Sequence, residues 1–321
     1  MDCLKGLVII LFVSCHPHSS QEPIDYNLAT LGKSDVYRQL NELTRSPHPL
    51  GSPRQKEISD WLLSEIPSEW EKSKQEFTAT TPNPLVATSG SPLSLSVEKS
   101  GYNILASRPG VKDCWVLVGS HYDTKPVNGV EYVGANDGAS TTMLLLQLAH
   151  FYKDQSFKCG LGLIWFDGEE PVLPDWDDGI HKHPLKQVDN TYGSRHFVER
   201  LDSCGDARCW KGSPVSAFVL LDMLGSHQLR LTPDLQSTPS LAQKQRALAE
   251  KLQIPIGFAA AIQDDHIPFL KAGIPAVNII DFNNTQFWHR AGDNVETLSL
   301  ESLNKSFKLA QSFIFELMSE L

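Results

Sequence analysis

Short apolar segments that alternate with amphipathic ones are the feature that most limits what this chain can fold into. Four runs, at 115–119, 161–166, 215–221 and 276–280, are almost entirely apolar. Runs of this kind are typical of strands that are buried on both faces of a sheet. The segments at 139–151, 192–201, 240–252 and 300–317 instead repeat apolar residues with a helical period. The alternation predicts an α/β protein with a mainly parallel, twisted central sheet and helices on both faces.

Two further helices are predicted upstream of the first strand. One begins at the capping residue Ser34, and the other covers about 55–66. A proline-rich turn at 46–53 separates them, and residues 80–92, which are rich in Pro, Thr and Ser, are predicted to be a connection. No change of composition marks a boundary after residue 30, so residues 30–321 are predicted to form a single domain.

Residues 1–20 are predicted to be a targeting segment. Lys5 supplies one positive charge, residues 6–13 are apolar, and the small residues Ser14-Cys15 end the run. The pattern fits a signal peptide or a bacterial lipoprotein signal in which Cys15 carries a lipid anchor; a frayed hydrophobic end is the alternative. We therefore expect an exported protein, which would be periplasmic or a membrane-anchored lipoprotein in a bacterium and secreted otherwise. The run is too short to span a membrane.

Composition and charge indicate which kinds of molecule the protein is expected to bind. Of 321 residues, 41% are hydrophobic and 21% are charged, which is ordinary for a folded protein. The net charge is −10 and no long run of Lys or Arg occurs, so nucleic acid is not an expected partner. We expect the protein to be a monomer.

Four cysteines lie beyond the targeting segment, and an even number suits an oxidising compartment. Cys204 and Cys209 lie close together and could form a local disulfide. Cys114 and Cys159 each precede a predicted strand, and they could form a disulfide or be two buried thiols.

Acidic residues and histidines gather after the carboxyl ends of the predicted strands. The carboxyl ends of parallel strands meet at one edge of a sheet, where functional groups collect. Carboxylates combined with imidazole suit Zn²⁺, which leaves one coordination position open in catalytic sites. The residues concerned are His121, Asp137, Glu169, Glu170, Asp222 and His289.

Each of these residues has a simpler interpretation when it is taken alone. Asp137 would cap the next helix, Glu169 and Glu170 would be solvated loop charges, and His289 would pack beside Trp288. Their coincidence at successive strand ends favours a functional site.

Several segments together resemble a known family. LVGSHYDT, GANDGAS, WFDGEE, LLDMLG and FWHRAGDN, preceded by PHPLGSP and NILASRPG, resemble the zinc-dependent aminopeptidase fold in order and spacing. The segments DGEE, YGSRH and DDHIPFL are more similar to one branch of that clan, the glutaminyl cyclases. The similarity extends from about residue 35 to the end of the chain.

The resemblance implies a site and a reaction. One zinc ion would be bound by Asp137, Glu170 and His289, with Glu169 as the general acid and base. The substrate would be a peptide or protein with an N-terminal Gln, whose α-amine attacks its own side-chain amide and releases ammonia. The resemblance also assigns roles to four further residues. Asp222 would bind a substrate nitrogen, and Asp264 would belong to a hydrogen-bond network beside the pocket. Trp176 and Trp288 would line the pocket.

Two alternatives remain open on sequence alone. A two-zinc aminopeptidase would use His121 and Asp222, together with Asp137, to hold a second ion. A non-catalytic binding domain would be expected to have lost a ligand or the acid/base residue, and neither is lost. Asn278 and Asn284 depart from the cyclase pattern, in which a histidine and an aromatic residue are expected, and Gly138-Ala139-Ser140 is closer to the peptidases.

Overall fold

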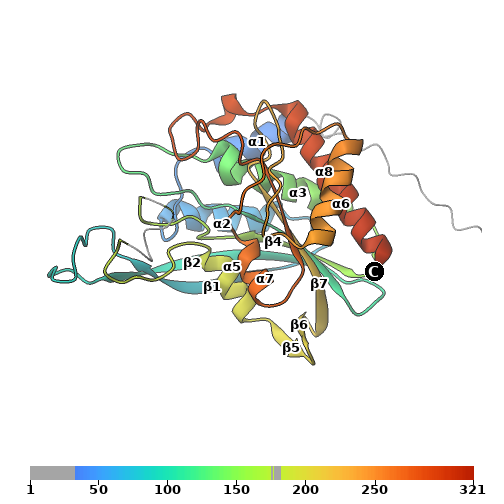
Figure 1. Cartoon of the computed structure of the whole chain (residues 1–321), viewed down its shortest axis with the longest axis horizontal. Helices are drawn as coiled ribbons and strands as arrows, with labels where there is room; N and C mark the ends of the chain where they lie inside the picture. The colour runs from blue at the N-terminus through green and yellow to red at the C-terminus, as the bar shows by residue number, and fades with distance from the viewer. Residues whose placement is uncertain (1–32, 175, 177–181) are drawn as a thin grey trace, which may run out of the picture.

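An eight-stranded, twisted sheet runs through the centre of the computed structural model, which describes residues 33–174, 176 and 182–321 (Figure 1). The strand order is β1-β2-β4-β3-β7-β6-β5, and β8 pairs with β7. The strands are β1 (Glu71–Pro82), β2 (Ser96–Arg108), β3 (Trp115–His121), β4 (Gly160–Phe166), β5 (Asp202–Cys204), β6 (Ala207–Trp210), β7 (Ser213–Asp222) and β8 (Ala276–Ile280).

The four central strands, β4, β3, β7 and β8, are parallel, and they are the four that the apolar runs predict. Every residue of β3 and β4 is buried, because helices cover both faces of the sheet there. The prediction of an α/β fold is confirmed. The sheet is mixed, however, because β1, β2, β5 and β6 pair antiparallel.

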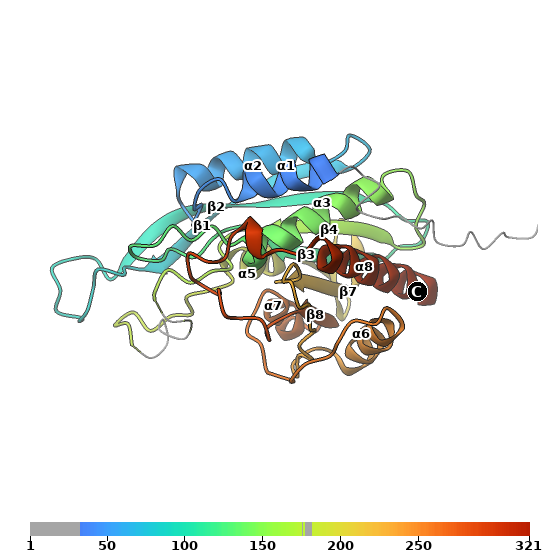
Figure 2. The ribbon, with the colours of Figure 1, turned by 90° about the horizontal axis from the view of Figure 1, so that it is seen from above.

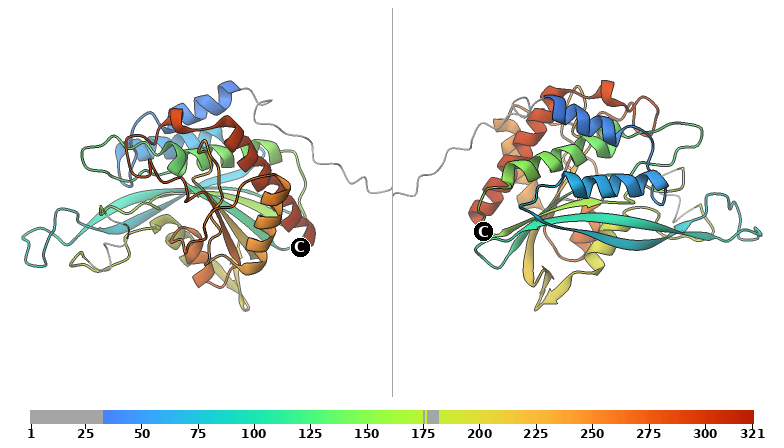
Figure 3. Two further views of the ribbon diagram at one scale, coloured as in Figure 1. Left: turned by 45° about the horizontal axis from the view of Figure 1, so that its top comes forward. Right: turned by 180° about the vertical axis from the view of Figure 1, so that it is seen from behind.

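The hairpin formed by β1 and β2 is absent from the predicted elements. The prediction of a connection at 80–92 is wrong for residues 80–82, since β1 continues to Pro82. Most of β1 is polar and only its last residues are regularly buried, so it lacks the apolar run that marks a central strand. Figure 3 shows this teal hairpin extending away from the rest of the molecule.

The helices form two layers, one on each face of the sheet (Figures 2 and 3). Side chains of α1, α2, α3, α6 and α8 join Val116 and Val118 of β3 in the larger core. Side chains of α5 and α7 join Trp115 and Leu117 of β3, which point to the opposite face, in the smaller core. The helices are α1 (Lys33–Leu43), α2 (Pro53–Glu65), α3 (Ser140–Tyr152), α5 (Tyr192–Glu199), α6 (Pro239–Lys251), α7 (His266–Lys271) and α8 (Leu300–Glu320), with short turns η1 (Ala135–Ala139) and η2 (Val295–Thr297).

Two disulfides stabilise the sheet. Cys114–Cys159 joins the residues that precede β3 and β4, next to the pair Trp115 and Gly160, and Cys204–Cys209 closes the β5–β6 hairpin. The local disulfide is confirmed, and the alternatives left open for the other pair are decided in favour of a bond.

Within the described part of the chain, no helix has the length and apolar character needed to cross a membrane. The predicted targeting segment at 1–20, with Cys15, lies outside the described residues.

Candidate active site

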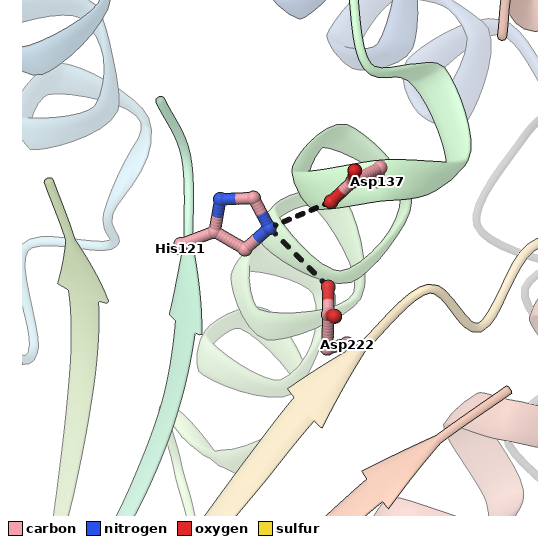
Figure 4. A group of neighbouring side chains, drawn as sticks. All are labelled: His121, Asp137 and Asp222. Atoms are coloured by element: carbon pink, nitrogen blue, oxygen red, sulfur yellow. Dashed lines mark hydrogen bonds and ion pairs between the residues drawn. The ribbon is translucent and has the colours of Figure 1, made fainter. Parts of the chain in front are cut away.

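The site lies at the carboxyl edge of the four parallel strands. His121 is the last residue of β3, and Asp222 is the last residue of β7. The Nε2 atom of His121 is 3.1 Å from Oδ1 of Asp137 and 3.3 Å from Oδ1 of Asp222 (Figure 4). All three side chains are buried. The sheet register therefore brings together residues that are far apart in the chain.

A second group of potential ligands shares Asp137 with the first. His289 Nε2 is 3.2 Å from Oε1 of Glu170 and 3.6 Å from Oδ2 of Asp137. In each group one ligand atom per residue lies within 4.8 Å of the others. Glu170 Oε2 is buried and has no hydrogen-bond partner among the described residues. Two carboxylates and an imidazole with an unsatisfied buried oxygen fit a divalent cation.

Backbone geometry, and not helix capping, places Asp137. It has φ −88° and ψ 96° within η1, and α3 begins after it without a side-chain cap. Asp293 accepts hydrogen bonds from the N–H groups of Asn136 (2.7 Å) and Asp137 (3.1 Å), and Tyr132 Oη donates to Asp137 Oδ2 (2.6 Å). These bonds hold the carboxylate toward the two histidines.

Burial and neighbouring groups shift the pKa values of the carboxyl groups in the site. Burial raises the pKa of Glu169 well above its usual range, and the neighbouring Asp264 raises it further. Burial also raises the pKa of Asp222, to about 7. Burial acts in the same direction on Asp137 and is the largest single effect, but His121, His289 and the hydrogen bond from Tyr132 together outweigh it and lower the pKa of Asp137 to about 2. Carboxyl groups with different proton affinities thus lie side by side, an arrangement suited to proton transfer.

Asp264 lies in a hydrogen-bond network, at the place where the resemblance assigns one. Its Oδ1 accepts from the backbone N–H of Asp265 (2.7 Å), and its Oδ2 accepts from Nδ2 of Asn278 (2.8 Å). Asn278 therefore keeps contact with Asp264, although it is an amide where the cyclases are expected to have a histidine.

A cavity of about 260 Å³ adjoins these groups. Trp176 and Trp288 both line it, and Trp288 stacks on His289 with 4.0 Å between ring centroids. A larger cavity of about 580 Å³ shares Trp288 with the first and is also lined by Asn284 and Asp293, but none of the five carboxyl groups that line the first cavity lines it. The smaller cavity is lined by the predicted residues Asp137, Glu169, Glu170, Asp222 and Asp264 as well as by the two tryptophans.

Four residues that support the site have no role predicted from the sequence. Asp123 follows β3 and carries the signal that identified His121, an acidic residue or histidine after a strand, whereas Lys125 does not. Tyr132 follows no predicted strand, and Asp293 lies in the segment FWHRAGDN without an assigned role, because only the fold brings the two residues to Asp137.

Buried carboxylates and histidines around an aromatic-lined cavity, at the carboxyl edge of a parallel sheet, define a metal-dependent α/β enzyme. The chain belongs to peptidase family M28, whose model matches residues 103–314. This confirms the resemblance to the aminopeptidase clan.

Two relatives of the chain are named glutaminyl-peptide cyclotransferase. The chain is 23% identical over 339 residues to a glutaminyl-peptide cyclotransferase of Drosophila melanogaster, covering 97% of this chain and 88% of the relative. It is 27% identical over 299 residues to the glutaminyl-peptide cyclotransferase of Dictyostelium discoideum, covering 80% and 78%.

Solved structures with a similar fold include both a glutaminyl cyclase and an aminopeptidase. A glutaminyl cyclase from an Acidobacteriales bacterium superposes with a TM-score of 0.75 at 25% identity, covering 94% of this chain and 98% of that chain. A leucine aminopeptidase precursor from Bacteroides thetaiotaomicron, at 19% identity and a TM-score of 0.70 over 88% and 96% of the two chains, has the same fold. The fold alone therefore does not separate the two activities.

Proposed function

We propose that the protein is a glutaminyl-peptide cyclotransferase, which converts the N-terminal Gln of peptides or proteins to pyroglutamate and releases ammonia. The observation that carries the proposal is the buried Glu169, with its raised pKa, beside Asp222 and a cation-binding group in a small aromatic cavity. The names of the two relatives and of the Acidobacteriales structure support the same reaction.

Asp137, Glu170 and His289 would hold one Zn²⁺, since two carboxylates and one imidazole leave a fourth position for substrate. When bound, the ion supplies Lewis-acid polarisation of the side-chain amide oxygen of the substrate.

The protein's own groups would then direct the protons. The α-amine nitrogen attacks the amide carbon, the bond from that carbon to the side-chain nitrogen breaks, and ammonia leaves. Glu169 takes a proton from the α-amine and gives it to the leaving nitrogen, for which a carboxyl of raised pKa is suited. Asp222 accepts a hydrogen bond from a substrate N–H. Nucleophile and electrophile belong to one molecule, so Trp176 and Trp288 need only hold the ring-forming rotamer and exclude water.

A two-metal aminopeptidase is the second candidate, and one observation favours it. His121, Asp137 and Asp222 form a second group whose ligand atoms lie within 4.8 Å of one another. A second ion there would share Asp137 with the first, and water would then be the nucleophile.

We further propose that the protein is exported as a monomer. The signal-like residues 1–20 and the disulfides Cys114–Cys159 and Cys204–Cys209 support an oxidising compartment. In a bacterium, Cys15 would carry the lipid anchor. Mass spectrometry of the mature N-terminus tests this, because a lipidated Cys15, a cleaved signal and an uncleaved chain have different masses.

The reaction is tested with two short peptides, one beginning with Gln and one with Leu, each incubated with the purified, zinc-loaded protein. We expect mass spectrometry to show loss of ammonia from the Gln peptide and an intact Leu peptide. Release of the first residue would establish the aminopeptidase instead. If neither peptide changes while zinc is bound, both proposals fail for these substrates.

A further inference from the structure

The segment that carries Glu169 and Glu170 belongs to no helix or strand, yet side chains bind all its N–H groups. Asp123 accepts from the N–H of Glu169 (3.0 Å) and of Glu170 (3.2 Å). Asp189 accepts from the N–H of residue 172 (3.3 Å) and of residue 173 (2.8 Å). Residue 171 is proline and has no N–H. Two buried carboxylates therefore satisfy every donor between residues 169 and 173.

Lys125 binds the same segment from its carbonyl side. Its Nζ donates to the carbonyl oxygens of Pro171 (3.1 Å) and Leu173 (2.9 Å). The carbonyl of Glu169 is bound separately, by the N–H of Thr191 (2.8 Å). Lys125 is thus the side chain that binds the carbonyls one and three residues after Glu170.

The hydrogen bonds of Lys125 matter because this lysine is buried. Its side chain is 3% exposed, and no other Lys or Arg of the described residues is buried. A buried ammonium group requires acceptors and negative charge around it. Its positive charge lowers the pKa values of Glu170 and Asp189, both of which burial raises. Lys125 therefore contacts the segment by hydrogen bonds and acts on Glu170 by its charge.

We propose that Lys125 is a positioning residue of the active site. Together with Asp123 and Asp189 it fixes the backbone of residues 169–173, so that the Glu170 carboxylate meets His289 and the Glu169 carboxyl faces the cavity. The inference rests on the proposed function, because it takes Glu170 as a metal ligand and Glu169 as the proton carrier. Outer residues that orient metal ligands typically change metal affinity by about 10- to 100-fold.

The test is Lys125→Met, which removes the ammonium group and keeps the apolar stem. We expect a zinc dissociation constant that is about 10- to 100-fold higher, measured by competition with a chelator. We also expect a shifted visible spectrum of the cobalt(II)-loaded protein, and a lower kcat at saturating zinc with little change in KM. The matched control is Lys72→Met, because the Lys72 ammonium also donates to a main-chain carbonyl, that of Ile66 (2.8 Å).

Each outcome decides between the possible roles of Lys125. If Lys125→Met lowers the melting temperature of the metal-free protein but leaves the zinc affinity and cobalt spectrum unchanged, Lys125 is only structural and the inference is wrong. If that variant does not fold, Asp189→Asn tests the same segment from its N–H side, and an unchanged zinc affinity there overturns the inference. Failure of the unaltered protein to bind zinc or to cyclise the Gln peptide would overturn the proposed function itself.

Discussion

Glu169 is the residue on which the proposed proton transfer depends. It is 5% exposed, and its backbone N–H is held by Asp123, so the carboxyl has a fixed position and little access to water. Burial raises its pKa well above the usual range, which brings the group closer to the pKa that a proton carrier needs near neutral pH.

We expect Glu169→Gln to lower kcat by about 10²- to 10⁴-fold, because an amide of the same size cannot carry the proton. Zinc content, measured by atomic emission, should stay the same as in the unaltered protein. Glu199→Gln, on the exposed end of α5, is the control and should keep full activity. Full activity of Glu169→Gln would remove the assigned role, and loss of zinc would make Glu169 a ligand.

His48 shows how burial links a single residue to the pH dependence of stability. Its Nδ1 lies 3.0 Å from the carbonyl of Ser46, and its Nε2 lies 2.6 Å from the carbonyl of Tyr122. Burial lowers the pKa of His48 below the ordinary value of 6.5 despite these acceptors. Below pH 6.5 the unfolded chain therefore binds a proton that the folded chain does not.

The free energy of unfolding should consequently fall as the pH is lowered from 6.5 toward the folded pKa of His48, by at most about 1.4 kcal/mol per pH unit from this group. Urea unfolding of the chelator-treated protein at several pH values measures the slope. His48→Gln should make the slope shallower, whereas His227→Gln, at an exposed position, should leave it unchanged. An equal slope in the His48 variant would contradict the prediction.

At the scale of elements, η1 connects the sheet to α3 and holds Asp137. Gly138 has φ +95°, a conformation that side chains rarely adopt, and a Cβ there would lie 2.9 Å from Cε1 of His121. The glycine therefore permits both the turn and the close approach of His121 to Asp137.

We expect Gly138→Ala to destabilise the protein by more than the roughly 1–2 kcal/mol of backbone strain alone, and to weaken zinc binding, because the methyl group displaces His121. Gly129→Ala is the control: its φ is +73°, and a Cβ there meets nothing within 4 Å. Denaturant unfolding and chelator competition measure the two effects. Equal losses in the two variants would show that the contact with His121 is unimportant.

At the scale of the whole molecule, the two disulfides close loops of different length. Cys114 and Cys159 are 45 residues apart and enclose η1 and α3, whereas Cys204 and Cys209 are 5 residues apart. A longer loop removes more conformational entropy from the unfolded chain, so the first disulfide should stabilise the fold more than the second.

Loop-closure entropy gives about 4 kcal/mol for the long loop and about 2 kcal/mol for the short one. We expect the double variant Cys114→Ala/Cys159→Ala to lose more free energy of unfolding than Cys204→Ala/Cys209→Ala, as measured by denaturant unfolding of each variant. The reverse order would show that native-state contacts outweigh the entropy of the unfolded chain.

The sequence by itself determined the central strands, most helices and the types of ligand. Apolar runs mark β3, β4, β7 and β8 because these strands are buried on both faces. Polar residues directly after such runs, such as Glu170, must lie at the carboxyl edge of the sheet. The hairpin of β1 and β2 was missed because its exposed face leaves no apolar run.

Only the tertiary structure decided which polar groups meet. Asp293 binds the backbone of Asp137 from 156 residues away, and Lys125 binds the carbonyl of Leu173 from 48 residues away. These contacts depend on strand register and loop paths, which follow from packing of the whole chain and leave no local pattern. The sequence therefore names the groups that can do chemistry, and the fold sets the distances and burial that give each its proton affinity and its neighbours.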